Sequence, residues 1–200
     1  KPGDSPSWTQ GDIDTLAAIP NYYLLYYYQT QNWIDYQKNH DTRASEVIKI
    51  EDELIEKFKD IDLVAKPEEL MKRGGAYYSD SAAELMADIH NDAGTTHIVN
   101  TLNNGAIPGI HKDAVVEIPA IISKSGASAI PTSILRPDID SLVRSVKDFE
   151  LLTINAALTG DEDSAIRALI SNPIGPDINT ARDLWADLKR DNAGMIGLFN

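Results

Sequence analysis

The chain has 200 residues, 42% of them hydrophobic and 24% charged, which is the composition of one folded domain rather than of a disordered protein. Its formal net charge of −13 argues against binding to nucleic acid or to an anionic membrane, because both need basic residues that neutralise phosphate. There is no cysteine, and no apolar run reaches the roughly 18 to 20 residues of a membrane span, so we expect a soluble, cytoplasmic protein.

The first seven residues differ in character from the rest. The chain starts without an initiator Met, and residues 1–7 are rich in Pro, Gly and Ser, which disfavour regular structure. We interpret residues 1–7 as a linker or a start left by expression, and residues 8–200 as one domain. The chain is therefore expected to be a piece of a longer protein.

Tyrosine is concentrated near the start: six of the eight tyrosines lie in the first 36 residues, and five of them fall in the run 20–28. Because Pro20 ends or kinks a helix over 14–32, the tyrosine run is expected to begin a fresh helix, with proline near its first turn. A phenol can pack as an aromatic ring, donate a hydrogen bond or act as a base. Packing is the default interpretation for all five.

Helical periodicity follows. The clearest helix is predicted over 44–58, with one apolar stripe formed by Val47, Ile48, Ile50, Leu54, Ile55 and Phe58. Ser81, three residues before Glu84, predicts a capping box at the start of another helix. Helical spacing returns over 142–154 and 178–188, with breaks at Gly160-Asp161 and Asn172-Pro173.

Two segments between these helices read as strands. Residues 96–102 and 115–122 are rich in branched side chains, and the turn sequences Asn103-Asn104-Gly105 and Pro108-Gly109 separate them. Since Pro119 cannot donate to a ladder, the second strand is expected to be an edge strand or to carry a bulge. The pattern as a whole predicts a mainly helical α+β domain with a small sheet.

Known chemical signatures are scarce. The sequence has no glycine-rich dinucleotide motif, no P-loop and no serine-nucleophile motif. Histidines at 40, 90, 97 and 111 stand singly without the spacing of metal ligands, and His97 is expected to be a packed or surface residue of its strand. The acidic groups at 68–69 and 161–163 are explained by favourable charge at helix starts.

Six segments nevertheless carry a resemblance when they are taken in order. They are Pro20-Asn21-Tyr22-Tyr23-Leu24-Leu25-Tyr26-Tyr27, 40–47 (HDTRASEV), 72–79 (KRGGAYYS), 103–108 (NNGAIP), 116–119 (VEIP), and Asn172-Pro173 followed by Gly175-Pro176-Asp177. Together, from about residue 8 to about residue 191, they resemble the C-terminal half of family 4 glycoside hydrolases. Segment 73–79 is most similar to the 6-phospho-β-glucosidase branch of that family.

The resemblance implies a lactate/malate dehydrogenase C-terminal-like domain with a small antiparallel sheet, whose NAD-binding Rossmann half is absent from this chain. It implies two cofactors, NAD and a divalent metal, usually manganese, both bound mainly by the missing N-terminal half. That half also holds the family's metal-ligating cysteine and histidine and its acidic catalytic residue. The partners implied are a phosphorylated disaccharide or β-glucoside, the chain's own N-terminal Rossmann domain and a homo-oligomer, with no nucleic acid and no membrane.

The chemistry implied departs from hydrolysis by two carboxylates. In this family NAD oxidises the sugar at C3, the ketone acidifies the proton on C2, a tyrosine removes that proton, and the aglycone is eliminated. Water then adds and the hydride returns. We therefore expect part of a 6-phospho-β-glucosidase, and we expect the isolated chain to be inactive.

The resemblance places the tyrosine base on Tyr23 and a substrate-binding arginine on Arg43. A free phenol ionises near pH 10, so a tyrosine base working near neutrality needs a positive charge that stabilises the phenolate by about 4 kcal/mol. Without the resemblance, Tyr23 is one packed aromatic residue among five, and Arg43 is a surface residue near a helix start. Arg73 with Gly74-Gly75 forms either a loop near the sugar or merely a turn.

A hypothesis from another class stays open. Tyrosine-rich surfaces are common at protein interfaces. The chain could be a non-enzymatic module for oligomerisation or sugar binding, with the tyrosine run as an aromatic interface.

Overall fold

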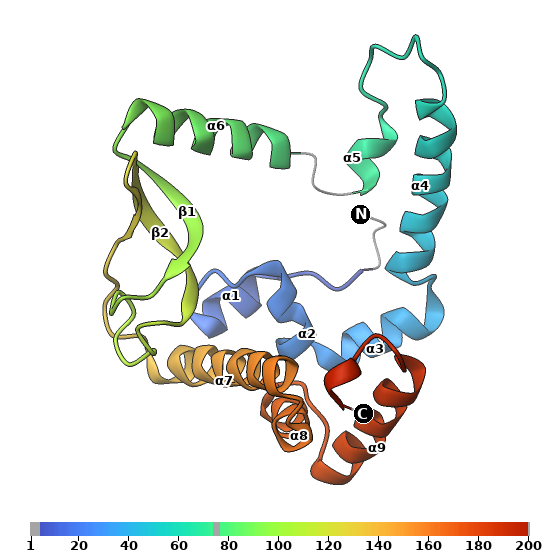
Figure 1. Ribbon diagram of the computed structural model, residues 1–200, viewed down its shortest axis with the longest axis vertical. Helices are drawn as coiled ribbons and strands as arrows, with labels where there is room; N and C mark the ends of the chain where they lie inside the picture. Colours follow the sequence, from blue (N-terminus) through green and yellow to red (C-terminus); the bar gives the residue numbers. More distant parts are fainter. Residues whose placement is uncertain (1–4, 74–76, 200) are drawn as a thin grey trace. The chain divides into compact units, whose positions relative to one another are not determined.

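The structure is a computed structural model that describes residues 5–73 and 77–199, and the chain divides into two compact units, residues 1–84 and 85–200. Unit 1 is helical, whereas unit 2 combines a three-stranded sheet with long helices (Figure 1). The elements of unit 1 are α1 (Gln10–Leu16), the 3₁₀ turn η1 (Tyr22–Leu24), α2 (Leu25–Tyr28), α3 (Thr30–Asn39), α4 (Arg43–Phe58) and α5 (Glu69–Arg73). Helix α6 (Tyr78–Asn91) crosses the boundary, and unit 2 continues with β1 (Thr95–Leu102), β2 (Val115–Ser123), β3 (Gly126–Ala129), α7 (Pro137–Thr159), α8 (Glu162–Ser171), α9 (Ile178–Asp191) and the 3₁₀ turn η2 (Gly197–Phe199).

The tyrosine run does begin a new helical segment after Pro20, as predicted, but not one continuous helix. It starts as the 3₁₀ turn η1, continues for one turn as α2, and breaks at Gln29, whose φ of −126° is outside the helical range. Tyrosine has a weak intrinsic helix propensity, so a run of five gives a long helix little support. The result is a sharp turn rather than a straight rod.

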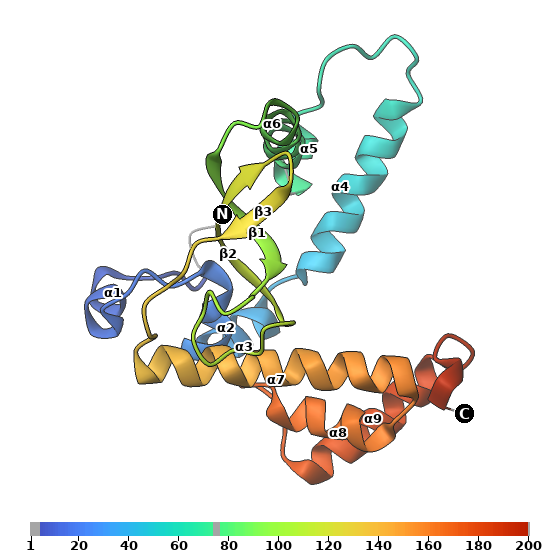
Figure 2. The same ribbon diagram turned by 60° about the vertical axis from the view of Figure 1, so that its left-hand side comes forward.

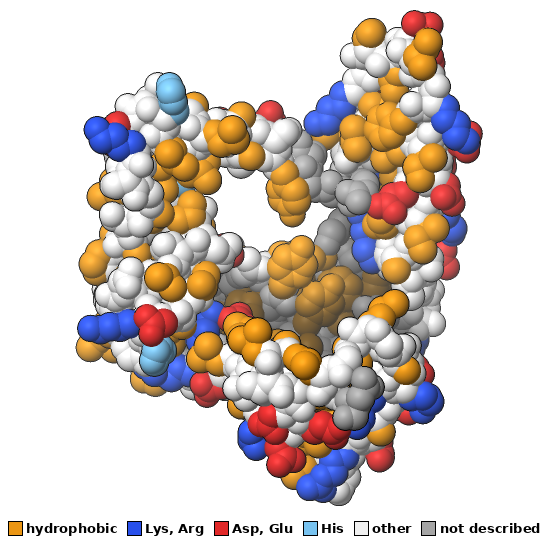
Figure 3. Space-filling view, viewed as in Figure 1, with side chains coloured by type: hydrophobic (Ala, Val, Ile, Leu, Met, Phe, Trp, Pro, Cys, Tyr) orange, Lys and Arg blue, Asp and Glu red, His pale blue; other side chains and the backbone are white. Residues whose placement is uncertain are grey.

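Helix α4 begins and ends close to the predicted limits, and the Thr42 hydroxyl caps it by accepting from the Ser45 backbone N–H at 3.2 Å. The predicted apolar stripe is only partly buried. Leu54 is 3% exposed, but the exposed fractions of Ile48, Ile55 and Phe58 are 58%, 56% and 55%. At 100° per residue the apolar positions span about 160° of the helix, an arc wider than one short neighbouring helix such as α5 can cover. Hydrophobic side chains accordingly remain visible along α4 (Figure 3).

The capping box predicted at Ser81 is wrong. Helix α6 starts at Tyr78, so Ser81 lies inside the helix, where its backbone N–H is bonded to the Tyr77 carbonyl. A capping residue must have a non-helical backbone, and Ser81 does not. Asp80 provides the favourable negative charge in the first turn instead.

The two predicted strands pair antiparallel as β1 and β2, in a register that runs from Thr95 opposite Ile122 to Leu102 opposite Val115. A third strand, β3, was not predicted; it pairs with the end of β2, and Figure 2 shows all three strands. Strand β2 is therefore central, which contradicts the edge-strand prediction drawn from Pro119.

Pro119 is tolerated because it lies just beyond the ladder with β3, which ends at the pair Ala120 and Ala129. The Pro119 carbonyl accepts from the Ile130 N–H at 2.8 Å, so its carbonyl and its nitrogen face the β3 side. There, no ladder hydrogen bond needs the N–H that proline lacks. Pro119 therefore has a neighbouring strand only on its β1 side, as in an edge strand, although β2 as a whole is central.

The core of unit 2 forms between one face of the sheet and the loop 103–114. Along β2 the residues Val116, Ile118, Ala120 and Ile122 are buried while their neighbours are exposed. Two of these residues belong to a cluster with buried side chains of the loop, namely Ala106, Ile107, Ile110 and Ala114. The alternation is that of a half-buried strand.

The Asn103-Asn104-Gly105 turn is confirmed, with positive φ at Asn104 (46°) and Gly105 (91°). Asn103 does more than turn the chain. It is fully buried, its amide donates to the carbonyls of Ile107 (3.2 Å) and Ile110 (2.9 Å), and its carbonyl accepts from the Ile107 N–H at 2.7 Å. One side chain thus satisfies several backbone groups of the core loop.

The predicted break at Gly160-Asp161 is confirmed, since Gly160 ends α7 with a φ of 71° and Asp161 caps α8. Pro137 stands at the start of α7. Asp177 caps α9 by accepting from two backbone N–H groups. Helix α7 extends five residues further at each end than the predicted 142–154. The mainly helical α+β architecture is confirmed, and among the described residues no helix has the length and apolar character of a membrane span.

Candidate functional site

Tyr23 lies at the centre of η1, on a turn that is held at both ends. The Asn21 side-chain oxygen accepts from the Tyr23 backbone N–H at 2.9 Å, and the Asn21 carbonyl accepts from the Leu24 N–H at 3.1 Å. Leu25, directly after the turn, is fully buried, which stabilises the fold by about 1.5 to 3 kcal/mol. Tyr23 itself is 71% exposed, so its phenol is available to a ligand.

The Tyr23 ring belongs to an aromatic cluster. It packs edge-on against Tyr22, with centroids 6.0 Å apart and planes at 75°, and lies nearly parallel to Tyr26 at 6.4 Å and 15°. Tyr26 in turn packs 4.7 Å from Trp33, which is buried. The exposed phenol of Tyr23 is therefore supported by rings that lead into the interior of unit 1.

Trp33 is the residue that sequence reasoning missed. It contacts Tyr22, Tyr26 and Tyr36, and Tyr36 stacks on His40 at 4.1 Å. Part of the signal was available, because Trp33 and Tyr36 are three residues apart on α3 and so lie on the same helix face. Asn21 was missed too, although asparagine before a helical turn is a typical cap.

Arg43 is the first residue of α4 and connects it to α5. Its guanidinium donates to Glu46 at 3.2 Å and to the Lys72 carbonyl at 2.7 Å. At the other end of α5, Lys57 pairs with Glu69 at 2.7 Å, and this hydrogen bond lowers the pKa of Glu69. Short α5 is thus fastened to α4 at both ends.

The structure does not by itself gather the predicted site residues into one cluster. Tyr23 contacts the rings of Tyr22 and Tyr26, whereas the Arg43 contacts described above lie on α4 and α5. Arg73 is the last residue of α5, and Gly74 and Gly75 lie outside the described residues. What unit 1 offers is an exposed phenol on a rigid turn and a guanidinium at a helix start.

The histidines have individual partners. His97 Nε2 lies 2.6 Å from an Asp88 oxygen, as a half-buried residue of β1, and His40 Nδ1 lies 2.8 Å from the Tyr36 carbonyl. Over residues 5–73 and 77–199, no three His, Cys, Asp or Glu side chains are grouped so that they could hold a metal ion.

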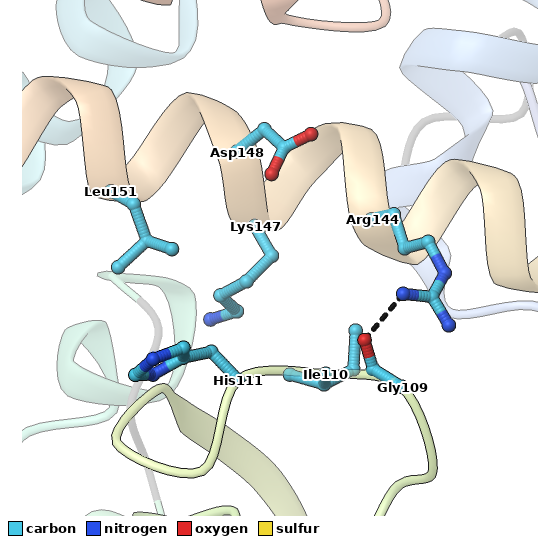
Figure 4. Close-up of a pocket in the computed structure, with 7 residues that line it drawn as sticks. All are labelled: Gly109, Ile110, His111, Arg144, Lys147, Asp148 and Leu151. Atoms are coloured by element: carbon cyan, nitrogen blue, oxygen red, sulfur yellow. Dashed lines mark hydrogen bonds between the residues drawn. The ribbon is translucent and has the colours of Figure 1, made fainter.

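Unit 2 has an open hollow of about 520 Å³ between the loop at 109–111 and α7 (Figure 4). Its cationic groups are engaged by the protein: Arg144 donates to Asp140 and to the Gly109 carbonyl, and Lys147 donates to the Val115 carbonyl. Residue 109 has a φ of 81°, a backbone conformation that residues with a side chain rarely adopt, which explains the glycine there. Neither Tyr23 nor Arg43 lines this hollow, whose contacts fasten the loop to α7.

Comparison with known proteins places these observations in a family. Residues 11–175 match the family described as "Family 4 glycosyl hydrolase C-terminal domain". The chain is 38% identical over 196 residues to the "Probable 6-phospho-beta-glucosidase" of Bacillus subtilis (strain 168), covering 96% of this chain and 44% of that protein. It is also 38% identical to the 6-phospho-β-glucosidase BglT of Thermotoga maritima, covering 98% of this chain and 46% of BglT.

The fold is shared as well. A structure of the Thermotoga maritima 6-phospho-β-glucosidase with manganese, NAD⁺ and glucose-6-phosphate matches with a TM-score of 0.87 and 37% identity, covering 98% of this chain and 46% of that one. The chain thus spans less than half the length of these relatives.

Proposed function

This chain belongs to the family 4 glycosyl hydrolases through their C-terminal domain, and on that premise we propose that it is the C-terminal part of a 6-phospho-β-glucosidase. The whole enzyme would hydrolyse 6-phospho-β-glucosides. The observation that carries this proposal is the exposed phenol of Tyr23 on a capped turn, in a chain 38% identical to two proteins named as 6-phospho-β-glucosidases.

In the proposed reaction Tyr23 accepts the proton from C2 of the sugar, after which the aglycone is eliminated and water adds. Tyr23 suits this role because its ring packs on Tyr26 while the residue as a whole is 71% exposed. Arg43 is proposed to bind the substrate, since a guanidinium keeps its charge and donates several hydrogen bonds to phosphate or hydroxyl oxygens. Its bond to the Lys72 carbonyl fixes where that charge sits.

NAD, when bound, would supply the reversible oxidation at C3, and a divalent metal such as manganese would polarise the oxygen there. The related Thermotoga maritima structure contains both, and this chain covers only 46% of that protein. We therefore assign cofactor binding mainly to a preceding Rossmann half of the longer protein. This half is also the proposed partner of the chain.

The remaining assignments follow from the same premise. Residues 8–200 would form the C-terminal domain and residues 1–7 a linker, in an enzyme that works as a homo-oligomer. A phosphorylated sugar is charged and does not diffuse across membranes, so the enzyme would meet its substrate in the cytoplasm.

The experiment that tests the proposal uses the full-length protein with NAD, manganese and 4-nitrophenyl 6-phospho-β-glucoside. Tyr23→Phe removes only the hydroxyl and is expected to lower kcat by about 10²- to 10⁴-fold, with the fold intact by circular dichroism. Tyr27→Phe is the matched control, because Tyr27 is also exposed and lies on the neighbouring turn. It is expected to keep wild-type kcat.

If wild-type protein with both cofactors leaves the substrate intact, the proposed activity is wrong. If the wild type is active but Tyr23→Phe is equally active, the base is another residue. The tyrosine run would then be better explained as an aromatic interface.

A further inference from the structure

An exposed base faces a problem of orientation. A general base has to lie within about 3 Å of the proton that it removes, and a side chain in solvent samples several rotamers. Tyr23 is 71% exposed, yet its neighbours restrict it on two sides. These neighbours have no role in the chemistry described so far.

The first restriction acts on the ring. Tyr26 lies nearly parallel to Tyr23, with centroids 6.4 Å apart and planes at 15°, within the range of offset stacking. Tyr26 is itself fixed by Trp33, which lies 4.7 Å away and is 9% exposed. The Tyr23 ring thus stacks on Tyr26, and Tyr26 packs on the buried indole of Trp33.

The second restriction acts on the backbone. Asn21 accepts from the Tyr23 N–H with its side chain and from the Leu24 N–H with its carbonyl, at 2.9 and 3.1 Å. Asn21 is exposed, so its side chain adds little to the core and its capping bond is its main described contact. Loss of this bond would leave the 3₁₀ turn free to change the direction of Tyr23.

We propose that Tyr26 and Asn21 are positioning residues, which hold the Tyr23 phenol in the one orientation that reaches the sugar C2 proton. This rests on the proposed function, in which Tyr23 is the base. Tyr26 acts through its ring and not through its hydroxyl, and Asn21 acts through its side-chain oxygen. Neither residue needs to touch the substrate.

The test uses the full-length enzyme with NAD, manganese and 4-nitrophenyl 6-phospho-β-glucoside. Tyr26→Ala is expected to lower kcat by about 10- to 100-fold with KM nearly constant, because a base misplaced by about 1 Å can cost that much. Tyr26→Phe restores the ring and is expected to restore kcat. Asn21→Ala is expected to lower kcat, and Asn21→Asp, which keeps an acceptor oxygen, to restore it.

A matched control separates positioning from packing. Tyr36 belongs to the same cluster through Trp33, 5.7 Å away, and its other ring contact is with His40 rather than with Tyr23. Tyr36→Ala is expected to lower the melting temperature as Tyr26→Ala does, but to leave kcat near wild type. With substrate deuterated at C2, the isotope effect on kcat should increase in Tyr26→Ala and Asn21→Ala but not in Tyr36→Ala, because proton removal becomes slower only when the base is displaced.

The outcomes distinguish the two proposals. If Tyr23→Phe is fully active, the base assignment and this inference both fail. If Tyr23→Phe is inactive while Tyr26→Ala and Asn21→Ala behave like Tyr36→Ala, only the positioning roles are overturned. Should Tyr26→Ala fail to fold, the Asn21 variants decide, since Asn21 is exposed and its replacement spares the core.

Discussion

Residues of the same type serve different purposes within a few positions of unit 1. Tyr23 and Tyr26 are three residues apart and stacked, but Tyr23 is mostly exposed while Tyr26 is half-buried against Trp33. Asparagine shows the same contrast: Asn21 caps a turn from the surface, whereas Asn103 is fully buried and bonds the backbone of a core loop. Composition counts such residues together, and only their contacts separate their roles.

Arg43 combines a structural contact with a proposed substrate contact, and a conservative change can separate the two. In the full-length enzyme, Arg43→Lys keeps the charge but loses the guanidinium fork. We expect KM to increase about tenfold or more, since hydrogen bonds of charged groups contribute about 1.5 to 3 kcal/mol. KM and kcat are measured with 4-nitrophenyl 6-phospho-β-glucoside.

Arg182→Lys on α9 provides the comparison, because Arg182 is exposed and distant in sequence. If Arg43→Lys changes only the melting temperature and leaves KM unaltered, Arg43 stabilises the packing of α5 on α4 but does not bind the substrate.

At the scale of elements, the junction of α6 with β1 shows how few side chains hold a helix to a sheet. One carboxylate oxygen of Asp88 accepts from the Thr95 hydroxyl and lies equally close, 2.6 Å, to His97 Nε2. Four residues on, Asp92 accepts from the Lys124 backbone N–H at 3.0 Å, at the turn between β2 and β3. Asp88 in the last turn of α6 and Asp92 just after the helix thus both contact the end of the β1–β2 ladder where Thr95 pairs with Ile122.

This junction predicts a pH dependence. Side-chain hydrogen bonds, the larger contribution from Thr95 and the smaller from His97, stabilise the Asp88 carboxylate and hold its pKa below the ordinary value of 3.8. A folded-state pKa below the unfolded one means that the stabilisation is fully present above about pH 3.8 and is lost as the pH falls through the folded value. Asp88→Asn is therefore expected to lower the urea midpoint at pH 7, and its deficit relative to wild type should shrink below pH 3.8.

Urea unfolding followed by far-UV circular dichroism measures this difference at each pH. Asp113→Asn is a suitable control, because Asp113 is a mostly exposed carboxylate of the same unit. An equal deficit at neutral and acidic pH would show that Asp88 stabilises unit 2 without its charge.

At the scale of the whole molecule, the chain matches less than half the length of its relatives. We expect the 200-residue chain with NAD and manganese to release no detectable nitrophenol from 4-nitrophenyl 6-phospho-β-glucoside, because we propose that the groups that bind both cofactors belong mainly to a preceding half of the longer protein. The full-length protein should be active under the same conditions, and its activity should depend on both cofactors. Hydrolysis by the isolated chain at the full-length rate would contradict the proposal that both cofactors are bound mainly by a preceding half.

Features that depend on residues close together in the chain can be read from the sequence. Turn chemistry at Asn104-Gly105, the helix break at Gly160-Asp161, the long helix α4 and the strands β1 and β2 could be predicted. Short-range backbone preferences decide such features. The ordered motifs also indicated the family and singled out Tyr23 as the candidate base.

Which side chains are buried, and which residues they contact, depends instead on how distant segments of the chain pack together. This packing made Trp33 the centre of the aromatic cluster, left Ile48, Ile55 and Phe58 of α4 exposed, and placed Pro119 in a central strand just beyond the β3 ladder. These outcomes depend on residues that are distant in sequence, and periodicity carries no information about where such residues meet. The exposure of Tyr23 and its packing on Tyr26, on which its proposed role depends, are likewise set by tertiary contacts and not by local sequence.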